Sequence, residues 1–156
     1  MFHPADIGKI GTGTTGWIRQ QSSTAAADLV AITLAASLTD CKWNMAIPGL
    51  YEGDRIRGVY LLGQVESAGN NVVINVDLRR MRAIAADNED ASIVNRTLTT
   101  ITADARLSRD NSYLDVGDGS GVEVKEGDIH YVCVKATTGA STDISLIGMV
   151  VVVDQA

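Results

Sequence analysis

The chain has 156 residues, of which 46% are hydrophobic and 21% charged, so it is long enough for one hydrophobic core and too short for two ordinary domains. Thirteen Lys and Arg against nineteen Asp and Glu give a net charge of -6, which argues against a protein that neutralises nucleic-acid phosphates. The composition of Trp 2, Tyr 4, Phe 1 and His 2 leaves few side chains for base stacking, acid–base catalysis or metal binding.

The start of the chain has no basic residues followed by an apolar run, so it does not resemble a secretory signal, and we expect a protein made in a cytoplasm. The longest apolar runs, Leu29 to Leu38 and Ile144 to Val153, are each about ten residues, whereas a membrane helix needs about 20. We expect no membrane partner. Cys41 and Cys133 are expected to be buried, reduced thiols, and a bridge between them would require neighbouring strands.

Residues 1–27 differ from the rest of the chain. They contain four glycines, a Gln/Ser/Thr-rich stretch at 20–24 and apolar residues without periodicity. We predict that residues 1–27 form an extended N-terminal arm and that residues 28–156 form the folded domain. The apolar residues of the arm either fold back on the domain or dock on another chain, because a glycine-rich segment cannot bury them within itself. The candidate partner-binding residues of the arm are Phe2, Ile7, Ile10, Trp17 and Ile18.

Short apolar runs separated by turn residues begin at Leu29 and are typical of an all-β domain. In Val72 to Arg79 the apolar residues alternate with Asn75, Asp77 and Arg79, which predicts a strand with one apolar and one polar face. The run from Ile56 to Val65 precedes it through Ala68-Gly69-Asn70-Asn71, and these turn residues predict a hairpin.

Further strands are predicted at Leu98 to Leu107, Ile129 to Ala136 and Ile144 to Val153. Val116 to Val122 contains three glycines and is predicted to be a loop. Val150 to Val153 places valines on both faces of the last strand, so we expect the core to cover one face and a second element, such as a partner subunit, to cover the other.

Two segments fit more than one structure. Ala25 to Leu38 fits a strand and also has leucines at helical spacing, and we favour the strand. Met81 to Ala91 fits a short helical turn or a solvated loop. Glu-Gly-Asp occurs at Glu52 and again at Glu126, each time directly before a predicted strand, and we interpret both copies as turns.

The strand origins number about eight, which predicts an all-β fold: an antiparallel two-sheet sandwich of the jelly-roll type. They are Leu29, Cys41, Arg55, Val72, Leu98, the region from Tyr113 to Val124, Ile129 and Ile144.

Motifs for catalysis and cofactor binding are weak. Gly11 to Gly16 satisfies GxGxxG, but no buried strand precedes it and no alternation of strands and helices follows, so we expect no cofactor. His3 lies in the arm and His130 in a predicted strand, where packing is its expected role. The two Cys and two His residues are scattered over the chain, and we expect no metal site and no catalytic residues.

Acidic residues suggest two further ideas. Asp87, Glu89 and Asp90, or Asp115 and Asp118, could supply oxygen ligands to calcium, but neither run has the EF-hand spacing, and a solvated acidic loop is the commoner case. A glycosidase needs two facing carboxylates, and nothing in the sequence selects such a pair.

The chain resembles the small jelly-roll proteins that decorate bacteriophage heads, known as decoration or cement proteins. The resemblance lies in the residues from Pro48 to Ile56, in the hairpin and strand that follow up to Arg80, and in Glu126 to Val153. The similarity covers residues 28–154 as a pattern of turns and strands and carries over no functional residues. It implies a non-enzymatic structural protein on the surface of a virion capsid. It also implies binding across subunits of the major capsid protein and a homo-oligomer, with a trimer favoured over a dimer.

Two alternatives stay open at this point. One is a component of a phage tail, collar or fibre. The other, from a different class, is a carbohydrate-binding β-sandwich module, and a carbohydrate-cleaving one belongs to the same class.

Overall fold

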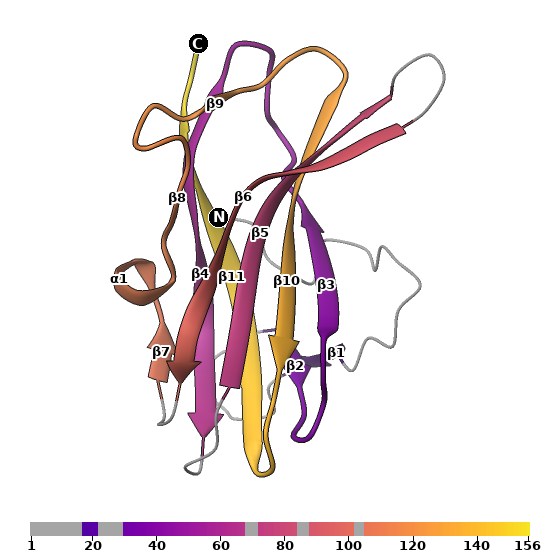
Figure 1. Ribbon diagram of the computed structural model, residues 1–156, viewed down its shortest axis with the longest axis vertical. Helices are drawn as coiled ribbons and strands as arrows, with labels where there is room; N and C mark the ends of the chain where they lie inside the picture. Colours follow the sequence, from indigo (N-terminus) through magenta and orange to yellow (C-terminus); the bar gives the residue numbers. More distant parts are fainter. Residues whose placement is uncertain (1–16, 22–29, 68–71, 84–87, 102–104) are drawn as a thin grey trace.

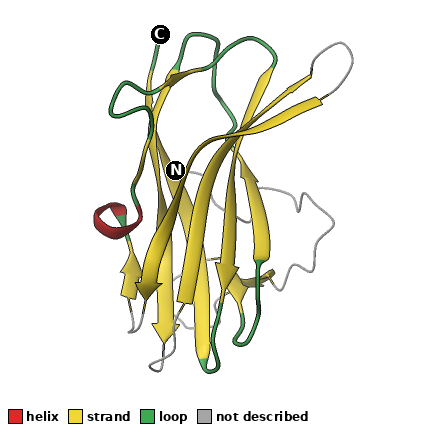
Figure 2. Cartoon of the chain, in the orientation of Figure 1, coloured by secondary structure: helices red, strands yellow, loops and turns green. Residues whose placement is uncertain are grey.

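The computed structural model describes residues 17–21, 30–67, 72–83, 88–101 and 105–156. Within these ranges the chain is almost entirely β-structure with one helical turn (Figure 2). The elements are β1 (Trp17–Gln21), β2 (Val30–Leu34), β3 (Cys41–Ala46), β4 (Arg55–Ser67), β5 (Val72–Ala83), β6 (Asn88–Ile101), β7 (Ala105–Leu107), α1 (Arg109–Ser112), β8 (Leu114–Asp115), β9 (Val122–Glu123), β10 (Asp128–Thr137) and β11 (Thr142–Asp154).

The strands form two antiparallel sheets. One is 7-stranded with the order β1-β2-β11-β4-β7, and β8 and β9 also pair with β4. The other is 4-stranded with the order β3-β10-β5-β6. The long strands of both sheets run along the long axis of the molecule (Figure 1). The predicted antiparallel two-sheet sandwich is therefore confirmed.

The pairing of strands is nested. β5 pairs with β6, β4 with β7, β3 with β10 and β2 with β11. Named in this order, each pair flanks the previous pair on both sides along the chain. This is the pattern of one long hairpin folded over into two layers, which is the arrangement of a jelly roll. The pairs β4 with β11 and β5 with β10 then join this folded hairpin into two continuous sheets.

The core lies between the two sheets. Alternate residues of each strand point inward, because side chains of a strand alternate between its faces. Burial is essentially complete for the largest of these side chains: Ile32, Leu34, Met45, Ile56, Leu61, Ile74, Leu78, Leu114, Ile144, Leu146 and Met149. These residues form one hydrophobic cluster, so the sandwich has a single core.

The predicted hairpin between Ile56–Val65 and Val72–Arg79 is wrong. β4 and β5 lie in different sheets, so the chain crosses from one layer to the other between them. Both strands have an inward apolar face, and these faces pack across the core. Local turn chemistry cannot distinguish this crossing from a hairpin, because both need only a short connection.

Two further expectations need correction. Met81 to Ala91 is neither a helical turn nor a solvated loop in its described part, because β5 continues to Ala83 and β6 begins at Asn88. Leu98 to Leu107 was predicted as one strand, but it contains the end of β6 and all of β7, which belong to different sheets. Thr, Ile and Ala are suited to strands in either sheet, so composition did not reveal the boundary.

The two Glu-Gly-Asp segments form the same turn, as predicted. Gly53 and Gly127 have positive φ values of 92° and 78°. The backbone N–H of Asp54 and that of Asp128 each donate to the carbonyl three residues earlier at 3.1 Å. Glycine is suited to this position because it adopts positive φ without steric cost. The turns lead directly into β4 and β10.

Three other predicted segments can be compared with the structure. The segment from Ala25 to Leu38 contains the strand β2 and no helix among its described residues, as favoured. Val116 to Val122 is a loop up to the start of β9. Residues 150–153 of β11 are each half-buried, and Val151 packs against the core.

Candidate functional site

The outer face of the β3-β10-β5-β6 sheet carries the most developed polar arrangement in the described part of the chain. On β5, Asn75, Asp77 and Arg79 alternate with buried residues and therefore face outward. The register places one residue of β6 and one of β10 beside each of them. The three rows across the face are Thr97 with Asn75 and Lys135, Asn95 with Asp77 and Cys133, and Ser92 with Arg79 and Tyr131.

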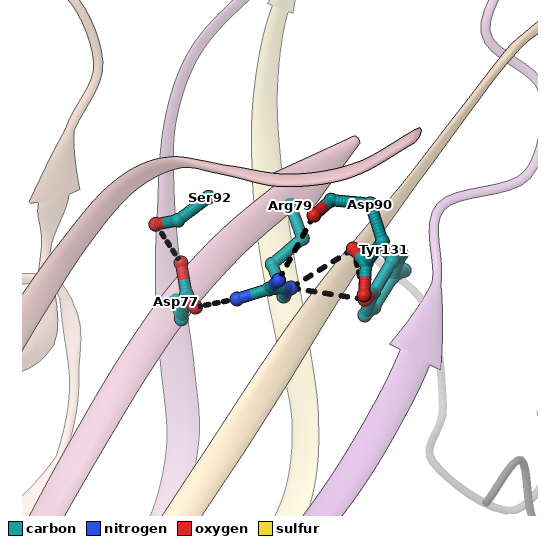
Figure 3. Close-up of polar contacts among 5 residues, drawn as sticks. All are labelled: Asp77, Arg79, Asp90, Ser92 and Tyr131. Atoms are coloured by element: carbon teal, nitrogen blue, oxygen red, sulfur yellow. Dashed lines mark hydrogen bonds and ion pairs between the residues drawn. The ribbon is translucent and has the colours of Figure 1, made fainter. Parts of the chain in front are cut away.

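Arg79 is held by three neighbours (Figure 3). Its Nη1 lies 2.8 Å from Asp77 Oδ2, and its Nε lies 3.1 Å from Asp90 Oδ1 and 3.0 Å from the Tyr131 hydroxyl. The Tyr131 hydroxyl donates to Asp90 Oδ1 at 2.7 Å, and the Ser92 hydroxyl donates to Asp77 Oδ1 at 2.5 Å. Each group in this network fixes another, so the guanidinium has little freedom to move.

The network sets the protonation states of its members. The Tyr131 hydroxyl, and after it the Arg79 guanidinium, lower the pKa of Asp90 against the opposing effect of burial. Burial, and after it the Asp90 carboxylate, raise the pKa of Tyr131 to about 12. Hydrogen bonds to Asp90 and Asp77 raise the pKa of Arg79. Near neutral pH the tyrosine is therefore a neutral donor and Asp90 a carboxylate.

Two more ion pairs continue toward the tip of the β5–β6 hairpin. Arg82 Nε and Nη2 lie 2.6 and 3.0 Å from the two carboxylate oxygens of Asp128, whose side chain is 1% exposed. This bidentate contact lowers the pKa of Asp128. Arg80 Nη2 lies 3.3 Å from Glu89 Oε1. These ion pairs link neighbouring strands of the sheet. Each carboxylate named here is paired with an arginine, so none of them is available for acid–base catalysis.

Beside Arg79 the outer face is hollowed into a polar groove of about 440 Å³. Its lining combines two acids, two bases, amides and hydroxyls with a single apolar residue: Asp40, Val73, Asn75, Asp77, Arg79, Ser92, Asn95, Thr97, Lys135 and Thr137. Lys135 Nζ lies 3.4 Å from Asp40 Oδ1, and Asn75 Nδ2 donates to Thr97 Oγ1 at 3.1 Å. The charges of the lining cancel in pairs, so the groove offers hydrogen-bonding groups with little net charge.

The predicted acidic candidates lie in different settings. Glu89 and Asp90 are on β6 and are engaged by Arg80 and Arg79. Asp115 and Asp118 are exposed residues of β8 and the following loop. Asp87 lies outside the described residues. Within the described ranges no three His, Cys, Asp or Glu side chains are grouped so that they could hold a metal ion.

His130 lies on the opposite, inner face of the same sheet and is 2% exposed. Neither ring nitrogen has a hydrogen-bond partner in the described part of the chain. Burial lowers the pKa of His130, against the opposing effect of the Asp128 carboxylate. The expected packing role is consistent with this position, because the imidazole is neutral near pH 7 and has no access to a substrate.

The candidate arm residues divide into two groups. Trp17 and Ile18 belong to β1, where they pair with Leu34 and Thr33 of β2 at the edge of the larger sheet. Residues 17–21 therefore join the sandwich of their own chain. Phe2, Ile7 and Ile10 lie outside the described residues, as do His3 and the segment Gly11 to Gly16.

The two cysteines are not bridged. Their strands are neighbours, but Cys41 lies opposite Ala136 and Cys133 lies opposite Asn44. Cys41 is on the buried face of the sheet and Cys133 on the outer face. Strand pairing therefore separates the two sulfur atoms although it brings the strands together.

Sequence reasoning identified Asn75, Asp77 and Arg79 as one face of a strand but not as part of a site. The alternation was the available signal. The partners on β6 and β10 depend on a register over long sequence separations, which a local pattern does not contain.

Two antiparallel sheets with nested strand pairing define the protein as a β-sandwich of the jelly-roll type. Comparison of the chain with known proteins gave no match to a family model, to a curated protein or to a solved structure. No helix in the described ranges is both long enough and apolar enough to cross a lipid bilayer.

Proposed function

We propose that this chain is a non-enzymatic structural protein of a bacteriophage virion, which decorates the capsid surface and stabilises it by binding across subunits of the major capsid protein. The jelly roll supports this proposal because the fold is widely used in viral shells. It hosts other functions as well, so the argument rests on the surfaces of the sandwich rather than on its fold.

The observation that carries the proposal is a largely apolar patch on the outer face of the larger sheet. On β4 and β11 the outward residues Tyr60, Leu62, Ile147, Val150 and Val152 are each half-buried, and core residues such as Val59, Leu61 and Met149 lie between them on the inward face. Val150 lies directly opposite Tyr60 in the register. A sheet face in water ordinarily carries polar residues at such positions.

We assign this patch to self-association in a homo-oligomer, a trimer or a dimer. The patch lies on two neighbouring strands inside the sheet, so it is broad enough to contact the same surface of another copy. Burial of apolar surface stabilises such a contact by about 25 cal/mol per Å². Contact with the major capsid protein is assigned to the N-terminal segment that contains Phe2, Ile7 and Ile10. Many weak contacts then add through the multiple copies on a shell.

Co-sedimentation with undecorated, expanded phage capsids tests the proposal. We expect saturable binding at a fixed copy number by the full chain and loss of binding on deletion of residues 1–16, a deletion that keeps β1. If the full chain stays in the supernatant at micromolar concentration, the decoration role is wrong, and binding to purified tails instead would identify a tail or collar component.

Self-association is measured separately by light scattering after size-exclusion chromatography. Val150→Lys is expected to give monomers, whereas the matched control Ile129→Lys, at a 56% exposed position on the other sheet, is expected to leave the oligomer intact. A monomeric wild-type chain would contradict the assignment of the patch.

A further inference from the structure

The polar groove on the outer face of the β3-β10-β5-β6 sheet has no part in the decoration role. It is made by side chains from three strands, and Asp40 adds a carboxylate from outside them. Its volume of about 440 Å³ falls within the range of about 300–1,000 Å³ that is usual for small-ligand sites. We propose that this groove binds a neutral, polyhydroxylated ligand, that is, a saccharide.

The charge of the lining selects the class of ligand. Lys135 pairs with Asp40, and Arg79 pairs with Asp77 and Asp90. A phosphate, sulfate or carboxylate on a ligand would compete with these acids for cations that are already neutralised. A cationic ligand would meet the same difficulty at the acids. A neutral ligand with many hydroxyls avoids both costs.

The remaining lining groups are suited to hydroxyls. The amides of Asn75 and Asn95 and the hydroxyls of Thr97 and Thr137 can each donate and accept hydrogen bonds. The Asn95 side chain makes no hydrogen bond with any other part of the chain that the structure describes. Arg79 and Lys135 have further N–H groups that can donate, and Asp40 and Asp77 have further lone pairs that can accept. The groove therefore presents donors and acceptors side by side, as the hydroxyls of a sugar do.

The groove is also preorganised. Arg79 is fixed by Asp77, Asp90 and Tyr131, and the Asp77 side chain is only 14% exposed. Ordering of flexible side chains on binding is a main entropic cost. The Arg79 side chain is already ordered by its contacts before a ligand binds, so this cost is small there. A side chain held in this way presents the same groups to every ligand.

A peptide is a poorer fit than a saccharide. Peptides that add to a sheet need a strand with free backbone groups at an edge. The groove lies on the face of the sheet over β5, between β10 and the edge strand β6, so a peptide strand added at the edge of β6 would lie beside the groove and not in it. Recognition there depends on side chains alone.

The lining contains no aromatic residue, so the sugar ring gains no stacking platform and hydrogen bonds must supply the affinity. We expect binding in the millimolar to high micromolar range for a single site. Display of many copies would raise the apparent affinity. This inference does not depend on the decoration role, and either can fail without the other.

The test is a glycan array that carries neutral oligosaccharides beside sialylated and sulfated ones, probed with the full chain coupled in many copies to fluorescent beads. Saturation-transfer NMR with the strongest neutral oligosaccharide then measures single-site binding. We expect signals for neutral glycans. Asn95→Ala is expected to weaken binding about tenfold, and Asn75→Ala is expected to act in the same direction. The matched control Gln64→Ala, an exposed amide on the other sheet, is expected to bind as the wild type does.

Thermal unfolding of each variant shows that the fold is intact, which is expected because Asn95 is exposed. The proposal is overturned if no neutral glycan gives a signal on the array or at millimolar concentration by NMR. It is equally overturned if charged glycans bind in preference, or if both asparagine variants bind as the wild type does.

Discussion

Burial of His130 makes the stability of the fold dependent on pH between about 7.5 and 5.5, a range in which few other groups titrate. His130 is 2% exposed, and neither of its ring nitrogens has a partner within the described residues. Protonation would place a charge at a buried position near Arg80 and Arg82, both of which disfavour it; burial is the main cause of the lowered pKa. The Asp128 carboxylate offsets part of this effect.

The sign and size of the effect follow from proton binding by the unfolded chain. With the usual histidine pKa of about 6.5, the unfolded chain takes up a proton below this pH, while the folded chain, in which the pKa of His130 is lowered, takes one up only at more acidic pH, so stability falls as the pH falls. At pH 5.5 the expected loss is at most about 1.4 kcal/mol, because RT ln(1 + 10) has that value. This loss corresponds to a decrease in Tm of about 3–6 °C for a chain of this size.

Differential scanning calorimetry at pH 7.5 and pH 5.5 measures the effect. His130→Leu is expected to remove most of the difference in Tm between the two pH values and to raise stability at pH 7.5, since it replaces an unsatisfied buried polar group with an apolar one. The matched control is His3→Gln, which removes the other histidine. The lowered pKa values of Asp90 and Asp128 affect stability only at more acidic pH. If His130→Leu keeps the full dependence, or if His3→Gln abolishes it, the reasoning is refuted.

Three stability predictions can be checked together by urea denaturation. Asp54→Ala should lower the free energy of unfolding by about 3 kcal/mol, because the buried carboxylate accepts the backbone N–H groups of Tyr51 at 2.9 Å and Ala156 at 3.2 Å. Asp54→Asn keeps one oxygen acceptor and should lower it less. Ser112→Ala should cost about 1–3 kcal/mol, since the buried hydroxyl accepts the N–H of Leu61 at 3.0 Å, and a neutral result would show that another group replaces it. Gly63→Ala should cost about 3 kcal/mol, because a Cβ would overlap the carbonyl oxygen of Ser145; wild-type stability would mean that β4 and β11 separate easily.

Alternation and turn chemistry were enough to predict most strands. β5 was predicted from Val72 because its apolar and polar residues alternate strictly, and β10 and β11 were found within two residues of their ends. Both Glu-Gly-Asp turns were predicted because glycine and aspartate have local conformational preferences. Strands and turns of this kind are determined by residues that are close together in the sequence, so they can be predicted from the sequence alone.

Features that depend on long-range pairing were missed or misassigned. The connection from β4 to β5 was read as a hairpin, although β4 pairs with β11, and β5 pairs with β6 and β10. The ion pair of Arg82 with Asp128 brings together β5 and β10, strands that no local pattern relates. Glu89 and Asp90 were interpreted as loop residues because their charge resembles that of a solvated segment, and pairing with arginines across the sheet changes that expectation.

The position of β11 has a consequence for how the protein is made. β11 follows every other strand in chain order, yet it lies between β2 and β4 inside the larger sheet. During synthesis β2 and β4 therefore leave the ribosome with unpaired edges, and they stay so until β11 emerges. Exposed edges of this kind promote association between nascent chains. Yield of soluble protein should thus depend on synthesis rate and temperature, and a stop codon before residue 142 should give an insoluble product even though most of the core residues are present.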